Sequence, residues 1–182
     1  MNSFDKLCSL GMDNYGVVTS SDAKSLGLSA RVMSSLVKSG RLLHKGYGVF
    51  KLAICTSSEG MDRYAEAVAF GGKDAVLYGE SVLSMLNLAF VNPSVICVAT
   101  PHRIRRTLPS WVRLVRVHEH GAKVSYYKGL PCQPLSLAIR HCMKAILPER
   151  ILSALETAQH EGWLTDEESL ELKLALKTGA SI

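Results

Sequence analysis

Two short amphipathic stretches near the N-terminus, each closed by a glycine, constrain the fold more than any other feature of the sequence. In the first stretch, Ala23 and Leu26 are expected to face inward, and Gly27 ends the helix. Its expected N-cap is Thr19 or one of the serines behind it, and Asp22 lies near the positive end of the helix. Two short helices joined by a glycine-containing turn are typical of a helix-turn-helix.

The second stretch has the composition of a helix that could enter a DNA groove. Ser29 is its expected N-cap and Gly40 its end. The expected buried side consists of Val32, Met33, Leu36 and Val37, and the outer face of Ala30, Arg31, Ser34, Ser35 and Lys38. Small and hydroxyl side chains permit close approach to DNA, and Arg31 near the start could reach a base edge or a phosphate. The helix alone is equally compatible with an ordinary solvated face.

A β-hairpin is predicted directly after this helix. The run Arg41–Leu52 alternates on both sides of a glycine-containing turn, which places Lys45, Gly46 and Tyr47 at or near the tip. An exposed tip would lay Lys45 and Tyr47 along the DNA backbone or minor groove, whereas in another context Tyr47 would be a packing residue. A short helix containing Phe4, Leu7, Cys8 and Leu10, ended by Gly11, precedes these elements. Together they predict a winged helix-turn-helix.

The charge of the chain is concentrated in this region. Seven basic and three acidic residues lie in the first 52 positions, which therefore carry +4 of the total formal charge of +5. This excess favours a polyanionic partner. The N-terminus does not have the pattern of a secretory signal, no run approaches the length of a membrane span, and the five cysteines contain no Cys-x-x-Cys. We therefore expect a cytoplasmic protein with reduced thiols and no membrane partner.

Several motifs follow one another in a characteristic order. They are Gly16-Val17-Val18-Thr19, Gly27-Leu28-Ser29, Leu36-Val37-Lys38-Ser39-Gly40-Arg41-Leu42 and Lys45-Gly46-Tyr47-Gly48-Val49-Phe50. This order resembles the N-terminal domain of the AbiEi-type antitoxins, also described as predicted transcriptional regulators of viral defence. Downstream, the segments 75–83, 129–138 and 150–165 look like the family's strand and helix start, its Gly-Ile-Pro segment and its closing helical hairpin. The family's Thr-Pro-x-Arg-Thr segment with its Asp is replaced here, so its role is not carried over.

The resemblance implies a DNA-binding transcriptional autorepressor that is the antitoxin of a type IV toxin–antitoxin system. Such a protein would bind inverted repeats of double-stranded DNA in its own promoter, and the two-fold symmetry of such repeats would suit a dimer on DNA. The cognate nucleotidyltransferase-like toxin would be antagonised indirectly. DNA contacts are expected from Thr19, Ser29, Arg31, Ser34, Ser35, Lys38, Arg41, His44, Lys45, Tyr47, Arg103, Arg105 and Arg106.

The rest of the chain predicts a small α+β domain with a short sheet and C-terminal helices. Helices are expected over 60–70, 81–88, 134–147, 148–160 and 165–176, and strands over 95–99, 111–119 and 124–127. Ser81 is an expected cap, Thr165 and Glu168 form a capping box, and a bulge is expected at Leu114-Val115. With a linker over 55–59, the domains would be the winged module, residues 1–54, and the α+β domain, residues 60–182.

Five arginines and no acid lie between positions 103 and 116. They are Arg103, Arg105, Arg106, Arg113 and Arg116, and Arg116 would share a strand face with His118 and His120. Three interpretations of this patch remain open. The first is a solvated face of the sheet whose charge is neutralised by Glu66, Glu80 or Glu119. The others are a second surface for the DNA backbone and a site for RNA or an acidic partner.

No catalytic site, metal site or cofactor is predicted. His118 and His120 with His102 or Cys132 lack a structural zinc spacing, and Glu171-Leu172-Lys173 has no upstream Asp partner. Ser81 does not sit in a Gly-x-Ser-x-Gly motif, and Gly71-Gly72 is no phosphate loop. Two alternatives to a repressor are a small metal-dependent nuclease and a winged-helix module that binds another protein.

Overall fold

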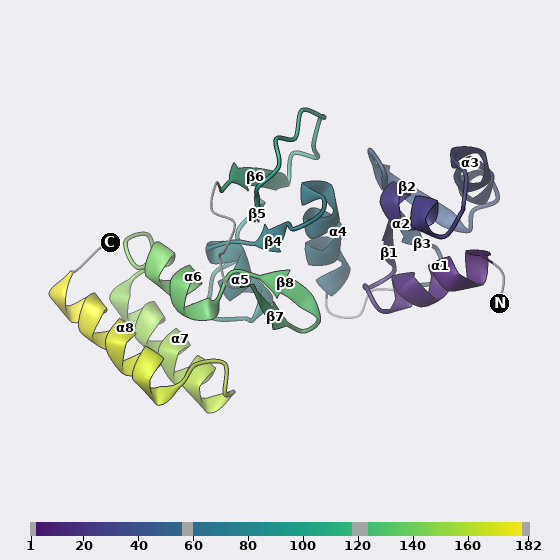
Figure 1. Cartoon of the computed structure of the whole chain (residues 1–182). Coiled ribbons are helices and arrows are strands. Elements are labelled where there is room, and N and C mark those ends of the chain that lie inside the picture. Colours follow the sequence, from purple (N-terminus) through teal and green to yellow (C-terminus); the bar gives the residue numbers. More distant parts are fainter. Residues whose placement is uncertain (1–2, 56–59, 118–123, 180–182) are drawn as a thin grey trace.

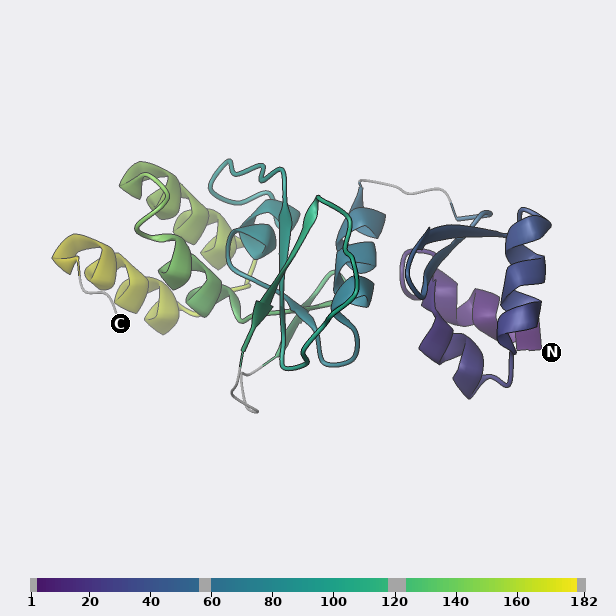
Figure 2. The same cartoon turned by 90° about the horizontal axis from the view of Figure 1, so that it is seen from above.

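The computed structural model describes residues 3–55, 60–117 and 124–179, and the chain is a mixed α+β protein with two sheets (Figures 1 and 2). The first sheet and three helices come from the N-terminal part. Their order is α1 (Ser3–Met12), β1 (Val17–Thr19), α2 (Ser20–Ser25), α3 (Ala30–Lys38), β2 (Leu42–Gly46) and β3 (Val49–Leu52). The strands pair antiparallel in the order β1-β3-β2, and a register shift lies between His44 and Gly46.

Caps and glycines start and end the N-terminal helices largely as predicted. Thr19 caps α2 in a capping box with Asp22, and the Ser29 hydroxyl accepts a hydrogen bond from the Val32 amide at the start of α3. The core under these helices consists of Leu7, Val18, Ala23, Met33, Leu36, Leu42 and Leu52. The prediction that Val32 is inward is wrong, because its side chain is 41% exposed.

Gly11 does not end α1, as the sequence predicted, because the helix continues to Met12. Gly11 is buried where α1 packs on the sheet, and a Cβ at this position would lie 2.5 Å from Leu52 Cδ1 and 2.9 Å from Val18 Cγ1. The glycine therefore permits close approach of helix and sheet and does not act as a stop signal.

The second sheet is mixed and has the order β6-β5-β4-β8-β7. Its strands are β4 (Val76–Leu77), β5 (Ile96–Thr100), β6 (Val112–Arg116), β7 (Ser125–Tyr127) and β8 (Leu130–Cys132). The pairs β5–β6 and β4–β8 are parallel, and the other two pairs are antiparallel. The helices of this part are α4 (Met61–Gly71), α5 (Glu80–Met85), α6 (Leu135–Cys142), α7 (Pro148–His160) and α8 (Asp166–Thr178).

Helix α4 lies between the five-stranded sheet and the N-terminal part, and it contacts β1 and β3 as well as β4, β5 and β6 (Figure 1). Helices α5 and α6 contact each other on the side away from α4, and the pair α7–α8 packs beyond them (Figures 1 and 2). The two chain ends consequently lie at opposite ends of the molecule. Among residues 3–55, 60–117 and 124–179, no helix has both the length and the apolar character to cross a membrane.

Two local predictions for the second part are wrong. Ser81 does not cap α5; the N-cap is Gly79, and the Ser81 hydroxyl accepts a hydrogen bond from the Cys97 amide at 2.7 Å. No bulge interrupts Leu114-Val115, since the register from Ile96↔Val112 to Thr100↔Arg116 is continuous. The two apolar neighbours lie on opposite faces of β6, and both are half-buried.

Helix α6 is shorter than predicted and ends at Cys142. Leu147 precedes Pro148 and is extended, with φ −56° and ψ 137°, because the proline ring disfavours the helical conformation of the residue before it. Helix α7 begins at Pro148 as predicted, and α8 begins with the predicted capping box of Thr165 and Glu168. The predicted linker lies mostly at residues 56–59, outside the described residues.

Candidate nucleic-acid interface

Helix α3 presents a polar stripe to solvent. Arg31, Ser34, Ser35 and Lys38 are all exposed, whereas Met33 and Leu36 anchor the opposite side of the helix in the core. Within the part of the chain that the structure describes, the side chains of these four residues make no hydrogen bond or ion pair. The capped N-terminus and the two buried residues fix the orientation of the helix, so the stripe faces solvent.

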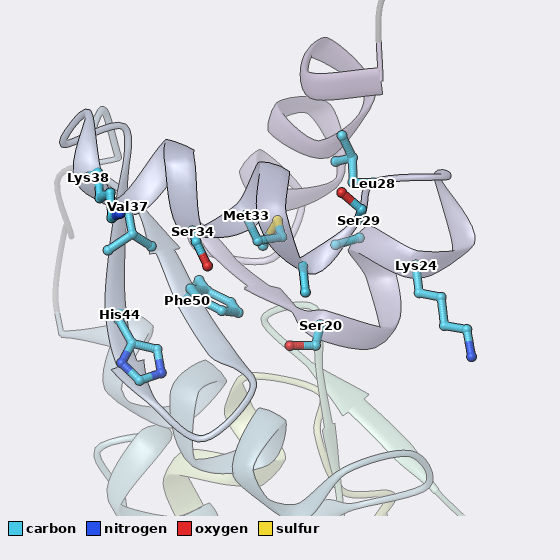
Figure 3. A pocket seen from close by; sticks show the side chains of 12 residues that line it. Ser20, Lys24, Leu28, Ser29, Met33, Ser34, Val37, Lys38, His44 and Phe50 are labelled. Carbon is cyan, nitrogen blue, oxygen red and sulfur yellow. The ribbon is translucent and has the colours of Figure 1, made fainter.

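A groove of about 620 Å³ lies beside this stripe, between α2, α3 and the β2–β3 hairpin (Figure 3). Its floor is apolar and includes Ala23, Met33 and Phe50. Lys24 and Lys38 belong to its lining, and both side chains are exposed. The remaining lining residues are Ser20, Leu28, Ser29, Ala30, Ser34, Val37 and His44.

The tip of the hairpin packs against the second part of the chain. Lys45 Nζ lies 3.0 Å from Glu66 Oε1 on α4, and the Glu66 side chain is almost completely buried. A Cβ at Gly46 would lie 2.7 Å from Cε1 of the Phe70 ring, so the backbone of the tip rests directly on that ring. The charge of Lys45 is thus neutralised within the molecule, in contrast to the free cation expected at an exposed tip.

Tyr47, next to Gly46 at the hairpin tip, also contacts the second part of the chain. Its side chain is 71% exposed, and the Arg106 guanidinium lies over its ring at 5.6 Å from the centroid. Arg106 Nη2 also donates a hydrogen bond to the Phe70 carbonyl oxygen at 2.6 Å, and Arg106 Nε is buried without a partner in the described residues. Arg106 therefore ties the segment between β5 and β6 to the hairpin.

Two further contacts join the same parts of the chain. Lys51 on β3 is buried and forms an ion pair with Asp62 on α4. The Tyr15 hydroxyl donates a hydrogen bond to the carbonyl oxygen of Lys128, beside β7. Together with the Lys45–Glu66 pair, these contacts join the N-terminal part to the second part of the chain at three separate points.

The other predicted DNA-contacting residues of the N-terminal part have internal contacts. The Thr19 hydroxyl donates to Asp22 Oδ2 at 2.7 Å and accepts from the Asp22 amide at 3.2 Å. The Arg41 guanidinium lies 5.5 Å from the centroid of the Phe4 ring, and the His44 ring lies 5.2 Å from that of Phe50. Arg41 and His44 are exposed, so these contacts orient their side chains without burying them.

The arginines of the second part do not form one uniform patch. Arg103 and Arg105 are exposed on the segment between β5 and β6, and Arg113 and Arg116 are exposed on the edge strand β6. Arg106 is half-buried and has the contacts described above. Of the acids expected to neutralise the patch, Glu66 pairs with Lys45, and Glu80 makes no ion pair in the described ranges. Glu119, His118 and His120 lie outside the described residues.

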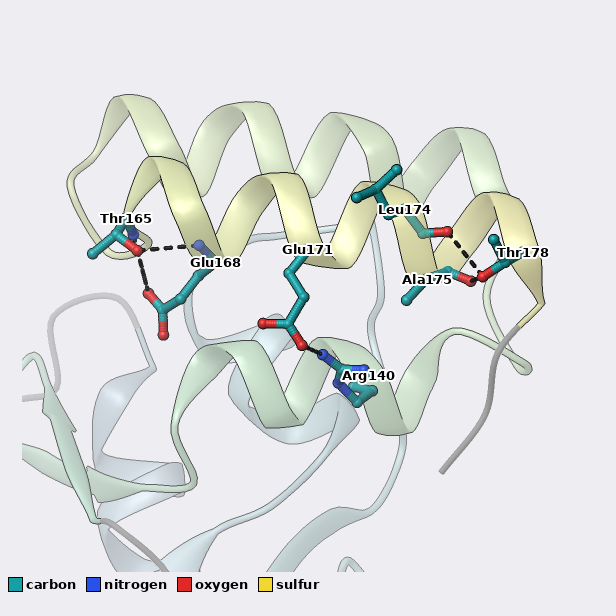
Figure 4. Close-up of polar contacts among 7 residues, drawn as sticks. All are labelled: Arg140, Thr165, Glu168, Glu171, Leu174, Ala175 and Thr178. Atoms are coloured by element: carbon teal, nitrogen blue, oxygen red, sulfur yellow. Dashed lines mark hydrogen bonds and ion pairs between the residues drawn. The ribbon is translucent and has the colours of Figure 1, made fainter.

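The remaining acidic, histidine and cysteine side chains of the described residues do not form a metal site. The described residues hold no group of three His, Cys, Asp or Glu side chains that could bind a metal ion. Glu171 on α8 accepts a hydrogen bond from Arg140 Nη2 on α6 at 2.5 Å, which joins the two helices (Figure 4). The five cysteines are free thiols, and burial raises the pKa of Cys132 and of Cys142 to about 12.

Sequence reasoning missed the surface of α4 that receives the hairpin. Glu66 and Phe70 form its centre, and Glu66 is buried on a helix whose other buried residues are apolar or glycine. The available signal was Glu66 itself, because an acid within an apolar run is expected to need a cationic partner when buried. The sequence offered several arginines and lysines for that role and no means of choosing Lys45.

Comparison with known proteins gives little further information. No family model matches the chain, and no curated protein matches it. Among solved structures, the chain is similar to the RV2827C protein from Mycobacterium tuberculosis, with a TM-score of 0.39 and 15% sequence identity, covering 94% of this chain and 80% of that chain. A likeness at this level carries no argument about function.

Proposed function

We propose that residues 1–54 are a winged helix-turn-helix DNA-binding domain in which α3 is the recognition helix and the β2–β3 hairpin is the wing. The observation that carries the proposal is the exposed stripe of α3. Arg31 and Lys38 there have no ionic partner among the described residues, and the hydroxyls of Ser34 and Ser35 lie between them along the helix. Cations that are fixed on a rigid helix and lack internal counter-charges suit a polyanion.

Within this proposal the residues have different roles. Arg31 reads a base edge or a phosphate near the start of the recognition helix, and Lys38 contacts the backbone. His44 and Arg41 extend the surface onto the hairpin. Thr19 and Ser29 act mainly as helix caps, because their hydroxyls already serve the backbone at the starts of α2 and α3.

The wing acts as a fixed support. Lys45 is neutralised by Glu66, so Tyr47 and the neighbouring Arg103 and Arg105 contribute contacts instead. The contact of Arg106 with Tyr47 places the segment that carries Arg103 and Arg105 next to the hairpin tip. In this arrangement Arg106 is a positioning residue, and the two exposed arginines contact phosphates.

The biological role that we propose is autorepression by an antitoxin of a type IV toxin–antitoxin system. It rests on the order of motifs that resembles the AbiEi-type antitoxins, together with the free stripe on α3. The protein would bind inverted repeats in its own promoter and would antagonise a nucleotidyltransferase-like toxin indirectly.

The test is a titration of fluorescently labelled DNA from the region upstream of the gene with the full-length chain. Arg31→Ala should weaken binding by about 1–3 kcal/mol and relax sequence preference. The matched control is Lys144→Ala, because Lys144 is also exposed but lies beyond α6. If Arg31→Ala and Lys144→Ala bind as the unmodified chain does, or if that chain shows no preference for the upstream DNA, the assignment of α3 is wrong.

A further inference from the structure

The groove beside α3 combines an apolar floor with a cationic rim. Met33 is 4% exposed and Ala23 1%, and the Phe50 ring forms the side contributed by the hairpin. Among the residues that the structure describes, its lining includes two lysines and one histidine but no carboxylate. We infer that this groove binds a small amphipathic anion, such as an aromatic carboxylate, with its apolar body on the floor and its charge at the rim.

The size of the groove fits this class of ligand. About 620 Å³ lies within the range of roughly 300–1,000 Å³ that is usual for small-molecule sites. Such sites are mostly apolar and hold a few polar groups that fix the orientation of the ligand. A sugar–phosphate backbone in the groove would place charged phosphates against the apolar floor, which is unfavourable because the phosphates would lose solvation without gaining a partner. The apolar lining therefore favours a small molecule with only one charged end.

The positive charges at the rim favour an anionic ligand. Lys24 comes from α2 and Lys38 from the last turn of α3, and neither has an ionic partner in the described ranges. The acid nearest to them in sequence, Asp22, is not part of the lining and serves the capping box. Ser34 adds a hydroxyl on the same side of α3, and in Figure 3 its oxygen points into the groove.

Two of the lining residues, Ser34 and Lys38, also belong to the exposed stripe of α3. A ligand in the groove would therefore compete with DNA for them, and this regulatory step rests on the proposed DNA-binding function. Arg31 does not line the groove. The two kinds of binding can consequently be separated by mutation.

The experiment is calorimetric titration of the full-length chain with 2-naphthoate and with the matched neutral compound 2-naphthalenemethanol. Naphthoate should bind with one-to-one saturation and roughly tenfold more tightly than the alcohol, because only the carboxylate is attracted to the cationic rim. The double variant Lys24→Ala/Lys38→Ala should remove this preference. Ala30→Phe, at an exposed position of the lining, should weaken both compounds by filling the groove.

Lys6→Ala is the control for charge, since Lys6 is exposed on α1 outside the groove. Equal affinity for the two compounds, no saturable binding, or naphthoate binding that survives Ala30→Phe would overturn the inference. Circular dichroism of each variant verifies that its fold is retained, and the lysine variant provides the test if Ala30→Phe does not fold.

The DNA titration distinguishes this inference from the proposed function. Saturating naphthoate should lower the affinity for promoter DNA, and Arg31→Ala should reduce DNA binding while leaving naphthoate binding unchanged. If naphthoate binds as expected and no DNA is bound, the proposed function fails and the ligand site stands. If DNA is bound and naphthoate is not, the ligand site alone fails.

Discussion

Lys45 Nζ on the hairpin lies 3.0 Å from Glu66 Oε1 on α4, and the side-chain exposures of the two residues are 35% and 5%. The pair therefore joins a partly solvated cation to an almost buried carboxylate. Because the carboxylate cannot be solvated in place, it depends on Lys45. Lys45, which the sequence predicts to contact DNA, thus forms part of the contact between the hairpin and α4 in the structure.

Lys45→Glu should consequently destabilise the fold. Placing a second carboxylate beside Glu66 should lower the free energy of unfolding by about 1–3 kcal/mol, since the site is only partly screened by water. The measurement is urea denaturation, and Lys38→Glu at an exposed position is the control. The charge-swapped pair Lys45→Glu/Glu66→Lys should recover part of the loss; a double variant no better than the sum of its single changes would contradict the coupling.

Gly46→Ala should also weaken the packing of the hairpin tip on α4 and lower the free energy of unfolding. The new methyl group would meet the Phe70 ring at 2.7 Å, so either the tip or the ring must move, at a cost of about 1–3 kcal/mol. In a Phe70→Leu background the ring edge is absent, and the same substitution should cost less. Thermal unfolding of the four proteins measures this difference, and an equal cost in both backgrounds would place the strain elsewhere.

Thr19→Ala should separate a structural role from a DNA-binding role. Loss of the capping box should reduce the free energy of unfolding by about 1 kcal/mol, and Thr19→Ser should restore most of it. DNA affinity, measured well below the melting temperature, should change less than twofold for both variants. A large loss of affinity in a fully folded Thr19→Ala protein would instead show that the hydroxyl contacts DNA.

Stability should fall at alkaline pH because of two buried thiols. Burial raises the pKa of Cys132 and of Cys142 from the ordinary value of 9.0 to about 12. The unfolded chain then loses these protons first, so stability present below pH ~9 declines as the pH rises toward ~12, by up to about 1.4 kcal/mol per pH unit for each thiol. Denaturation between pH 8 and 11 should show a shallower decline for Cys132→Ala than for the control Cys55→Ala.

The exposed arginines of the second part can be tested through salt dependence. Arg103→Ala/Arg105→Ala should reduce the slope of log K against log salt by up to ~2 and leave base preference unchanged, because phosphate contacts carry no sequence information. Arg113→Ala/Arg116→Ala on β6 is the matched comparison. Arg106 is left intact, since its loss would also disturb Tyr47 and Phe70. An unchanged slope would show that the segment between β5 and β6 does not contact DNA.

Local signals in the sequence predicted the local structure well. The hydroxyl caps of α2, α3 and α8, the proline that begins α7 and the alternation of the hairpin each depend on residues within a few positions of one another. At Gly11 the local signal failed because of a distant neighbour. Gly11 has the composition of a stop signal, but its position is determined by Leu52 across the helix–sheet interface.

Long-range pairing could not be derived from the same signals. The parallel pairing of β4 with β8 and the contact of Tyr47 with Arg106 join segments far apart in the chain. Val32 illustrates the limit for the candidate site: the helical period places it near the apolar side, and only the absence of a covering element among the described residues leaves it exposed. The polar stripe of α3 was predictable because exposure on a short helix follows from its buried side.

The docking of the hairpin on α4 has a consequence for protein engineering. A chimaera that joins residues 1–55 to an unrelated second half would expose the Phe70-binding surface of the tip and leave Lys45 without Glu66. The N-terminal part is therefore not a detachable cassette. If α3 is the recognition helix, as proposed, exchange of DNA specificity would require grafting the outer residues of α3, or transferring the hairpin together with its receiving surface on α4.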